Sequence, residues 1–375
     1  MKIGIITFHG SHNHGSVLQA YATQKTIEIL GYDSQIINFR MESQKRYYSL
    51  YPKGYGMMVL GQDILMLPLH HKRVVRARKF EDFIRKMELS GPEMRNREEL
   101  QSIVDNYDVY LTGSDQIWSN RIPEFAGSKE DFTGVYFFDF AENNKPRIAY
   151  ASSVGEITYN ELVEKKDWLE KFVSISTREK YGVDLLKRIV GKDIELVLDP
   201  TFLLNKQQWG ELAGDERLIK EPYVFLYTLH GIKHGIKWGR ILKRFSKKTG
   251  LRIVAVSPFF PITTVGIHNV VDAGPIDFLN LVKNAELVFT DSFHGTAFSI
   301  NMNKPFYSYV GKNTGDNRKM GIMKQFGLES RALESLEDIF GINDYSLDYK
   351  DYKKQIDLVR DHSKEWLMKA IHDIN

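Results

Sequence analysis

The sequence predicts an α/β protein of two domains, each built on a mainly parallel sheet with helices on both faces. Short apolar runs typical of buried strands alternate with helical periodicity from the first residues onward. The same alternation starts again after a polar stretch in the middle of the chain. A chain of 375 residues also exceeds the size at which one hydrophobic core stops growing, so we expect two cores.

The first series of elements begins with an apolar run at residues 3–8, a polar loop containing glycine, and a helix over residues 17–30. Strands that alternate with helices form a parallel sheet covered on both faces. Residues from about 40 to 100 differ in composition, and we interpret them as an insertion. The remaining strands of this series are expected at residues 34–39, 109–112, 147–152, 173–176 and 195–198.

The second series repeats this architecture after a charged stretch at residues 214–222, where we place the domain junction. The N-terminal domain then covers residues 1–217 and the C-terminal domain residues 218–375. We expect the final helix to pack back on the N-terminal domain. Within the second series we expect strands at 223–229, 251–257 and 287–290, and helices at 233–249, 276–285 and from 295 to 301.

The composition excludes several classes of function. The chain has 51 basic and 48 acidic side chains, a near-balance that gives no general reason to bind nucleic acid. The absence of cysteine removes disulfides, thiolate metal sites and a cysteine nucleophile, and a cytoplasmic location is the simplest assignment. The first apolar run is too short for an export signal, and no apolar stretch reaches about 18 residues, so any membrane contact would be peripheral.

One basic segment inside the insertion has several interpretations. Residues 70–80 read His-His-Lys-Arg-Val-Val-Arg-Ala-Arg-Lys-Phe. A basic amphipathic segment can lie on the anionic cytoplasmic face of a membrane or hold a pyrophosphate-bearing acceptor. A solvated helix face is the plainer alternative, and the sequence leaves all three open.

Four loops that follow strands are candidate ligand sites, because ligands of open α/β sheets bind beyond the carboxyl ends of strands. The first loop contains Asn13 and Gly15, which either position a ligand or are ordinary turn residues. Its three histidines have no accompanying carboxylate or cysteine, so we predict no metal site there.

The second and third loops contain a carboxylate and an arginine. Asp115 either caps a helix or orients a sugar hydroxyl as a base. Trp118 either stacks on a sugar ring or belongs to the core. Arg178 follows a strand and either binds a carboxylate or phosphate through two parallel hydrogen bonds or pairs with a neighbouring acid.

The fourth loop is Asp291-Ser292-Phe293-His294-Gly295, at the end of an apolar strand. It delivers a hydroxyl, an imidazole and a glycine to the start of a helix, where free N–H groups and the helix dipole favour an anion. Histidine titrates near neutrality and can act as a general acid. This turn is therefore the strongest candidate active site in the sequence.

Taken in order, these segments resemble the polysaccharide pyruvyl transferase family, and the resemblance spans most of the chain. It implies two Rossmann-like halves facing a cleft, as in the GT-B glycosyltransferases. It also implies phosphoenolpyruvate as donor, a sugar of a surface polysaccharide or its lipid-linked precursor as acceptor, a cyclic pyruvate ketal as product, and no cofactor. The matching segments are Asn13-His14-Gly15-Ser16, Gly113-Ser114-Asp115-Gln116-Ile117-Trp118, Ser176-Thr177-Arg178-Glu179, Asp199-Pro200-Thr201, Gly274-Pro275, Asp291-Ser292-Phe293-His294-Gly295-Thr296 and Asn317-Arg318.

The resemblance implies His294 as proton donor and Asp115 as a catalytic group on the acceptor side. The anionic donor would be held by Arg178, Ser292, Gly295 and Arg318, and the acceptor by Asn13, Gly15, Ser114 and Trp118.

The sequence departs from the family pattern at one position. Ser292 stands where characterised members carry arginine, so we expect Arg318 or a basic residue between 72 and 78 to supply the missing charge. Rival functions are a glycosyltransferase that uses a nucleotide sugar and a non-catalytic anion-binding module.

Overall fold

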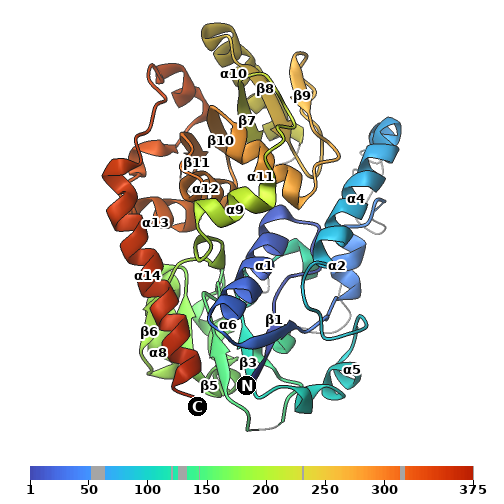
Figure 1. The fold of residues 1–375 in the computed structure, drawn as a ribbon, viewed down its shortest axis with the longest axis vertical. Helices are drawn as coiled ribbons and strands as arrows, with labels where there is room; N and C mark the ends of the chain where they lie inside the picture. Colours follow the sequence, from blue (N-terminus) through green and yellow to red (C-terminus); the bar gives the residue numbers. More distant parts are fainter. Residues whose placement is uncertain are drawn as a thin grey trace.

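The computed structural model describes residues 1–51, 64–119, 121–125, 133–142, 144–229, 232–312 and 317–374. They form two α/β domains stacked along the long axis of the molecule (Figure 1). Each domain contains a sheet of six strands, and every strand pair within the two sheets is parallel. The predicted fold class is confirmed.

The sheet of the first domain has the strand order β2-β1-β3-β4-β5-β6. Strand β1 lies between β2 and β3, so the chain leaves β1 toward one edge and later returns to its other side. Ligand sites of open α/β sheets form at such a switch point. The strands are β1 (Lys2–Ile6), β2 (Asp33–Ile36), β3 (Val109–Thr112), β4 (Arg147–Ala149), β5 (Phe172–Thr177) and β6 (Ile194–Leu196).

The sheet of the second domain has the order β12-β11-β10-β7-β8-β9, and its switch point lies between β7 and β10. Three of its strands, β9, β11 and β12, were not predicted from the sequence. The strands are β7 (Tyr223–Tyr227), β8 (Arg252–Val256), β9 (Ile267–Asn269), β10 (Leu287–Thr290), β11 (Phe306–Tyr309) and β12 (Ala332–Leu333).

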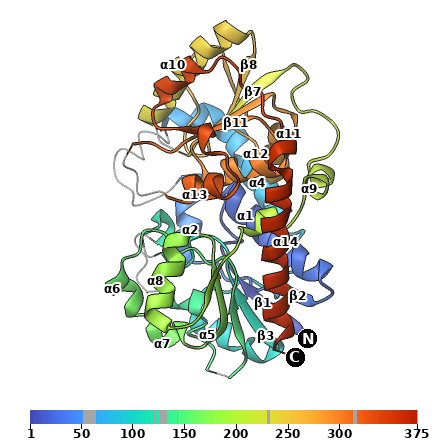
Figure 2. The ribbon, with the colours of Figure 1, turned by 90° about the vertical axis from the view of Figure 1, so that its left-hand side faces the viewer.

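Helices cover both faces of each sheet (Figure 2). The α-helices are α1 (His14–Ile29), α2 (Glu42–Tyr47), α4 (His70–Ile84), α5 (Arg97–Gln101), α6 (Tyr159–Val163), α7 (Lys166–Leu169), α8 (Lys180–Val190), α9 (Lys206–Ala213), α10 (Ile232–Thr249), α11 (Pro275–Asn284), α12 (Phe293–Asn301), α13 (Asn317–Gln325) and α14 (Lys350–His372). Short 3-10 helices are η1 (Leu67–Leu69), η2 (Val104–Asn106), η3 (Pro123–Phe125), η4 (Thr133–Phe137), η5 (Pro200–Phe202), η6 (Glu329–Arg331) and η7 (Leu336–Gly341).

One apolar core crosses from the first domain into the second. It contains buried residues of β1 and α1 together with buried residues of α11, α12 and α14. Across this contact the ring of Tyr21 lies 6.1 Å from that of Trp209, and Trp209 in turn packs edge-on against Phe298. The two domains are therefore held together by shared packing.

Helix α14 begins beside the second domain and runs down along the first (Figure 2). The backbone N–H of Leu198 donates to Ser363 Oγ at 2.9 Å, and Trp366 lies 6.0 Å from the ring of Tyr150. The last helix thus contacts residues that the sequence analysis assigns to the N-terminal domain.

The segment from about 40 to 100 contains α2, α4 and α5. Helix α4 reaches the second domain, because Lys79 forms a 2.7 Å ion pair with Asp277 and Arg76 donates to the carbonyl of Pro258 at 3.1 Å. No helix within the described ranges is long and apolar enough to cross a bilayer.

Candidate active site

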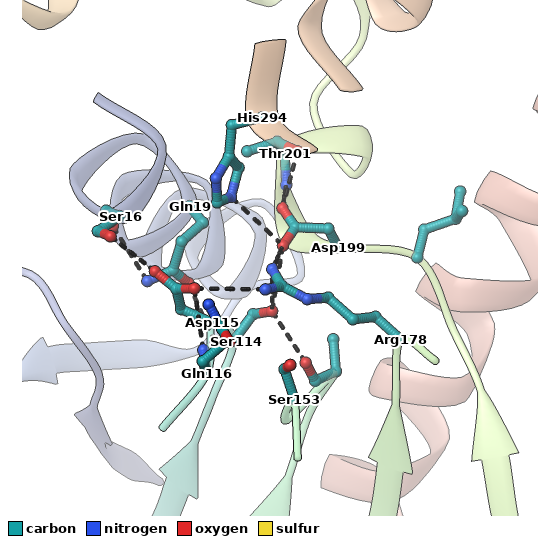
Figure 3. Close-up of polar contacts among 12 residues, drawn as sticks. Ser16, Gln19, Ser114, Asp115, Gln116, Ser153, Arg178, Asp199, Thr201 and His294 are labelled. Carbon is teal, nitrogen blue, oxygen red and sulfur yellow. Dashed lines mark hydrogen bonds and ion pairs between the residues drawn. The ribbon is translucent and has the colours of Figure 1, made fainter. Parts of the chain in front are cut away.

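The loops that follow β3, β5 and β6 bring three acids around the buried side chain of Arg178 (Figure 3). The guanidinium pairs with Asp199, lies 3.3 Å from Asp115 and 3.5 Å from Glu179. One guanidinium therefore faces three carboxyl groups. Arg178 is thus already compensated by acids of its own domain, as in the alternative that the sequence left open.

Asp115 stands in the left-handed region of the backbone, with φ of 71°, and turns its carboxylate toward α1. Ser16 Oγ donates to Asp115 Oδ2 at 2.6 Å. Burial acts to raise the pKa of Asp115, but the charges of Arg178 and His294 and the bond from Ser16 outweigh it and leave the pKa below its ordinary value. Asp115 is therefore ionised at neutral pH.

Asp199, like Glu179, is an acid of this cluster to which no role was assigned from the sequence. Its Oδ1 accepts from Thr201 N at 3.0 Å and from Thr201 Oγ1 at 2.8 Å, the bonds of an Asx turn. Burial opposes ionisation, but Arg178 and His294 hold the pKa of Asp199 well below its usual range. The sequence Asp199-Pro200-Thr201, which follows a strand, was the signal from which this residue could have been identified.

His294 approaches this cluster from the other domain, at the start of α12 (Figure 3). Its Nε2 lies 3.7 Å from Asp199 Oδ2, which is within ion-pair range but too long for a hydrogen bond. This nitrogen is buried and has no hydrogen-bond partner in the described part of the chain. The imidazole thus keeps one nitrogen uncommitted beside a carboxylate.

Gly15 makes room for that imidazole. A Cβ built on Gly15 would lie 2.0 Å from His294 Nδ1, closer than real Cβ contacts come. Asn13 caps α1 by accepting from Gly15 N at 3.0 Å, so α1 starts three residues earlier than predicted. Of these two residues predicted to bind the acceptor, Gly15 lies against His294, and Asn13 caps the helix that carries Gly15.

The turn before α12 is fixed to the second sheet by its acidic residue. The carboxylate of Asp291 accepts from Leu229 N at 2.8 Å and from the hydroxyl of Thr228, both just beyond β7. Since Asp291 follows β10, this contact spans the switch point of the second sheet. The switch points of the two sheets therefore meet at His294.

The donors expected to hold phosphate are partly committed elsewhere. Ser292 caps α12, since Gly295 N donates to its hydroxyl at 3.4 Å, and the ring of Phe293 lies 4.5 Å from the Arg178 guanidinium. Ser292 and Gly295 thus form a helix cap, and the first-turn N–H groups of Phe293 and His294 have no acceptor among the described residues.

A buried lysine lies behind the same turn and was not predicted. Lys319 Nζ donates to the carbonyl of Asp291 at 2.9 Å and to that of Tyr309 at 2.6 Å. The predicted Arg318 precedes it at the start of α13 and is partly exposed. The sequence therefore pointed to the start of α13 through Arg318, and the adjacent Lys319 was missed.

Trp118 lies in the core of the first domain. Its ring stacks on Phe137 with centroids 5.1 Å apart, and its Nε1 donates to the carbonyl of Tyr136 at 3.3 Å. With 2% of its surface exposed, it takes the core role rather than the sugar-stacking role. Ser114, in contrast, reaches the cluster, because its hydroxyl lies 3.2 Å from Asp199 Oδ2.

Arg76 is a second arginine between the domains. It donates to the carbonyls of His12 at 2.9 Å and of Pro258 at 3.1 Å, and it lies 5.2 Å from the ring of Phe80. No carboxylate of the described residues is within ion-pair distance of it, and its buried Nε has no partner there. Burial lowers the pKa of Arg76 to about 10, so it stays cationic at neutral pH.

The three histidines of the first loop diverge. His9 Nε2 lies 3.1 Å from Asn38 Oδ1, His12 pairs with Glu81 at 2.8 Å, and His14 Nε2 donates to the carbonyl of Ala273 at 3.1 Å. The three side chains thus have separate partners, and the described residues contain no group of three or more His, Cys, Asp or Glu that could hold a metal ion.

Solved structures with a similar fold include several UDP-GlcNAc 2-epimerases. The enzyme from Neisseria meningitidis bound to UDP-GlcNAc has a TM-score of 0.54 and 11% identity, with all of both chains covered. A putative UDP-N-acetylglucosamine 2-epimerase from Listeria monocytogenes has a TM-score of 0.54 and 14% identity over 99% of this chain and 95% of that one. At such identities the likeness shows the fold alone, a GT-B-like pair of Rossmann-like domains.

Curated proteins give no significant sequence match. The model of the family described as polysaccharide pyruvyl transferase, however, matches residues 13–313. This range begins at the cap of α1, contains Arg178, Asp199 and the 291–295 turn, and ends before Arg318. The chain belongs to the polysaccharide pyruvyl transferase family and is a transferase that modifies polysaccharides.

Proposed function

We propose that the protein transfers the enolpyruvyl group of phosphoenolpyruvate to two hydroxyls of one sugar, in a surface polysaccharide or its lipid-linked precursor. The observation that carries this proposal is the meeting of His294 with Asp199 across the domain boundary. A histidine that has an uncommitted nitrogen and lies beside a carboxylate is suited to give a proton to a substrate.

In the first step, His294 donates a proton to the methylene carbon of the donor, which becomes a methyl group. The neighbouring carbon gains oxocarbenium character, and the oxygen of the first sugar hydroxyl bonds to it. The proton of that hydroxyl passes to His294 and replaces the proton that His294 gave up.

In the second step, the oxygen of the second hydroxyl bonds to the same carbon. The bond from that carbon to the phosphate oxygen breaks, and phosphate leaves with the electron pair. The second hydroxyl proton leaves with the phosphate. The products are the cyclic ketal and inorganic phosphate, and no oxidant or cofactor takes part.

Asp115 serves the acceptor side in this proposal. Its lowered pKa makes it a weak base, so its role is to orient a hydroxyl and to stabilise positive charge at the reacting carbon. Ser16 and Arg178 hold the carboxylate in place through contacts of 2.6 and 3.3 Å.

The donor's negative charge needs cations beyond Arg178, which three acids already compensate. We assign the donor's anionic groups to Arg76 and Arg318, together with the free N–H groups at the start of α12. Arg76 is the basic residue between 72 and 78 that points between the domains. It would supply the charge that Ser292 lacks.

The experiment is a phosphate-release assay on purified protein with phosphoenolpyruvate and a panel of glycan acceptors. We expect release only when a suitable acceptor is present, with a pyruvate ketal detected on the product by NMR. Turnover of a nucleotide sugar, with neither phosphate release nor ketal across the panel, would assign the protein to the rival glycosyltransferase class. Anion binding without any turnover would favour the non-catalytic module.

A further inference from the structure

Charge is distributed unevenly over the segment that contains α4. Residues 64–80 hold five Lys or Arg and no Asp or Glu, whereas the whole chain has 51 basic against 48 acidic residues. Arg76 and Lys79 of this segment turn inward and bond to the second domain. The other basic and imidazole groups of the segment are exposed or partly exposed, namely His70, His71, Lys72, Arg73 and Arg78.

The same segment exposes large apolar side chains. Ile64, Leu65, Leu67 and Val74 are 58%, 64%, 53% and 39% exposed. Isolated exposed apolar residues are normal on a protein surface, but four close together on one segment are not. Val74 and Arg78 lie one turn apart on α4, so an exposed apolar and an exposed basic side chain are neighbours there.

The opposite face of α4 is anchored in the protein. Phe80, Phe83 and Ile84 are buried in the first core, so α4 is already packed against the protein through these residues. The first turn of α4 stands at the margin of the molecule in Figure 1. This face is therefore fixed in orientation and open to a partner.

Helix α10 shows that a basic surface does not by itself expose large apolar side chains. Its outward side is also basic and includes the exposed Lys243 and Lys247. Its large apolar residues Trp238, Leu242 and Phe245 are buried. The α4 segment, in contrast, combines cations with exposed apolar side chains and contains no Asp or Glu between residues 64 and 80.

We propose that the exposed side chains of residues 64–78 dock on an anionic lipid surface. Leucine side chains would enter the boundary of the headgroups, and the Lys and Arg side chains would pair with lipid phosphates, as in interfacial amphipathic helices. The segment offers cations and exposed aliphatic side chains without any carboxylate, the combination that a negatively charged lipid surface attracts.

This inference concerns where the protein works and does not depend on the reaction. Docking on lipid would matter for the reaction only if the proposed function is also right, because the inward side of α4 contacts the site. Arg76 bonds to the carbonyl of His12, next to the cap of α1. A helix with lipid on one side and the reaction site on the other would present the site to a lipid-linked sugar.

The experiment measures co-sedimentation of the full chain with vesicles of phosphatidylcholine, with and without phosphatidylglycerol. We expect binding only with the anionic lipid, and weaker binding at higher salt. The double variant Lys72→Glu/Arg78→Glu should lose about thirtyfold or more in partitioning, at roughly fivefold per removed cation. The double variant Leu65→Ser/Leu67→Ser should lose about tenfold or more.

Two matched variants control for charge and for apolar exposure. Lys243→Glu/Lys247→Glu on α10 removes the same charge elsewhere, and Leu358→Ser/Met368→Ser on α14 removes exposed apolar side chains elsewhere. Both should bind vesicles as the parent protein does. Circular dichroism and thermal unfolding establish that each variant is folded.

Three results would overturn the proposal. The first is no binding to anionic vesicles, and the second is an equal loss of binding in the α10 control. The third is a parent protein that self-associates in solution without lipid and becomes monomeric in the α4 variants, which would make the face an interface between copies of this chain. Phosphate release with a water-soluble acceptor, measured in parallel, keeps these outcomes separate from failure of the proposed reaction.

Discussion

The imidazole of His294 packs against the backbone of Gly15, so a residue of the second domain fits a gap left in the first helix of the other. A Cβ at Gly15 would stand 2.0 Å from His294 Nδ1 and 2.2 Å from its Cγ, near the root of the ring. The ring cannot avoid such a Cβ by a small rotation. The position of the proposed proton donor therefore depends on the absence of one side chain in the opposite domain.

The variant Gly15→Ala should lower kcat by about a hundredfold, because a reacting group displaced by about 1 Å costs that much. Steady-state phosphate release measures it. The control is Gly321→Ala on α13, where no atom lies within 4 Å of the added Cβ, and activity should be unchanged. Normal turnover in Gly15→Ala would show that the imidazole does not need this position.

The variant His294→Ala should reduce transfer by about 10²–10⁴ while the protein stays folded, since it removes the general acid and leaves the Ser292 cap intact. Activity is read as ketal formation and folding as the unfolding midpoint. A variant that still makes product at the parent rate would remove His294 from the mechanism.

The variant Arg178→Met should lower the free energy of unfolding by about 3–5 kcal/mol, because Asp115, Asp199 and Glu179 would stay buried without their cation. Chemical denaturation measures the change. Adding Asp199→Asn to this variant should restore part of the loss, since one unpaired charge disappears. If the double variant is no more stable than the single one, the pairing does not account for the loss.

The variant Arg76→Ala should raise the KM for phosphoenolpyruvate by about tenfold or more, as expected for losing one charged hydrogen-bonding partner. Arg76→Lys should recover part of the affinity. The matched control is Lys79→Ala, which breaks the other link from α4 to the second domain. Equal effects in Arg76→Ala and Lys79→Ala would mean that Arg76 acts by holding α4 in place.

The free energy of unfolding should fall as the pH drops from 6.5 toward 3. Burial is the largest cause that lowers the pKa of His9 to about 4 and that of His14 to about 3, from an ordinary value of 6.5. Between these values the unfolded chain binds more protons than the folded one, so acid favours unfolding. Stability from these residues is complete above pH 6.5.

Denaturation at a series of pH values measures this slope, and His14→Gln should flatten it. The substitution removes one of the two buried groups and keeps an amide that can still donate to the carbonyl of Ala273. An unchanged slope in His14→Gln would show that His14 does not contribute. Below about pH 4.5, protonation of Glu81, whose folded pKa is about 2, adds a further loss of stability.

The main strands could be predicted because their apolar runs are continuous, as at β1, β3, β7 and β10. The missed strands have weaker signals. β9 is three residues long with no buried position, and β12 has only two residues. The start of α1 was placed too late because His14 and Gly15 are typical of a loop, while the cap at Asn13 decides the boundary.

The motif residues of the site were predictable one at a time, but their contacts were not. Arg178 and Asp115 are 63 positions apart, and Arg76 and Pro258 are 182 apart, so no local pattern states that they meet. The same limit explains Trp118, whose aromatic ring suits a sugar as well as a core. Only the packing of Phe137 on its face decides between the two.

The core that crosses from α1 to α11, α12 and α14 makes the two halves one cooperative unit. Heating should therefore melt both sheets in a single calorimetric transition, and neither half expressed alone should hold its native packing. Such coupling also limits how far the halves can part during a catalytic cycle. Substrates would then enter through movements of the loops that surround His294, while the shared core keeps the two halves in place.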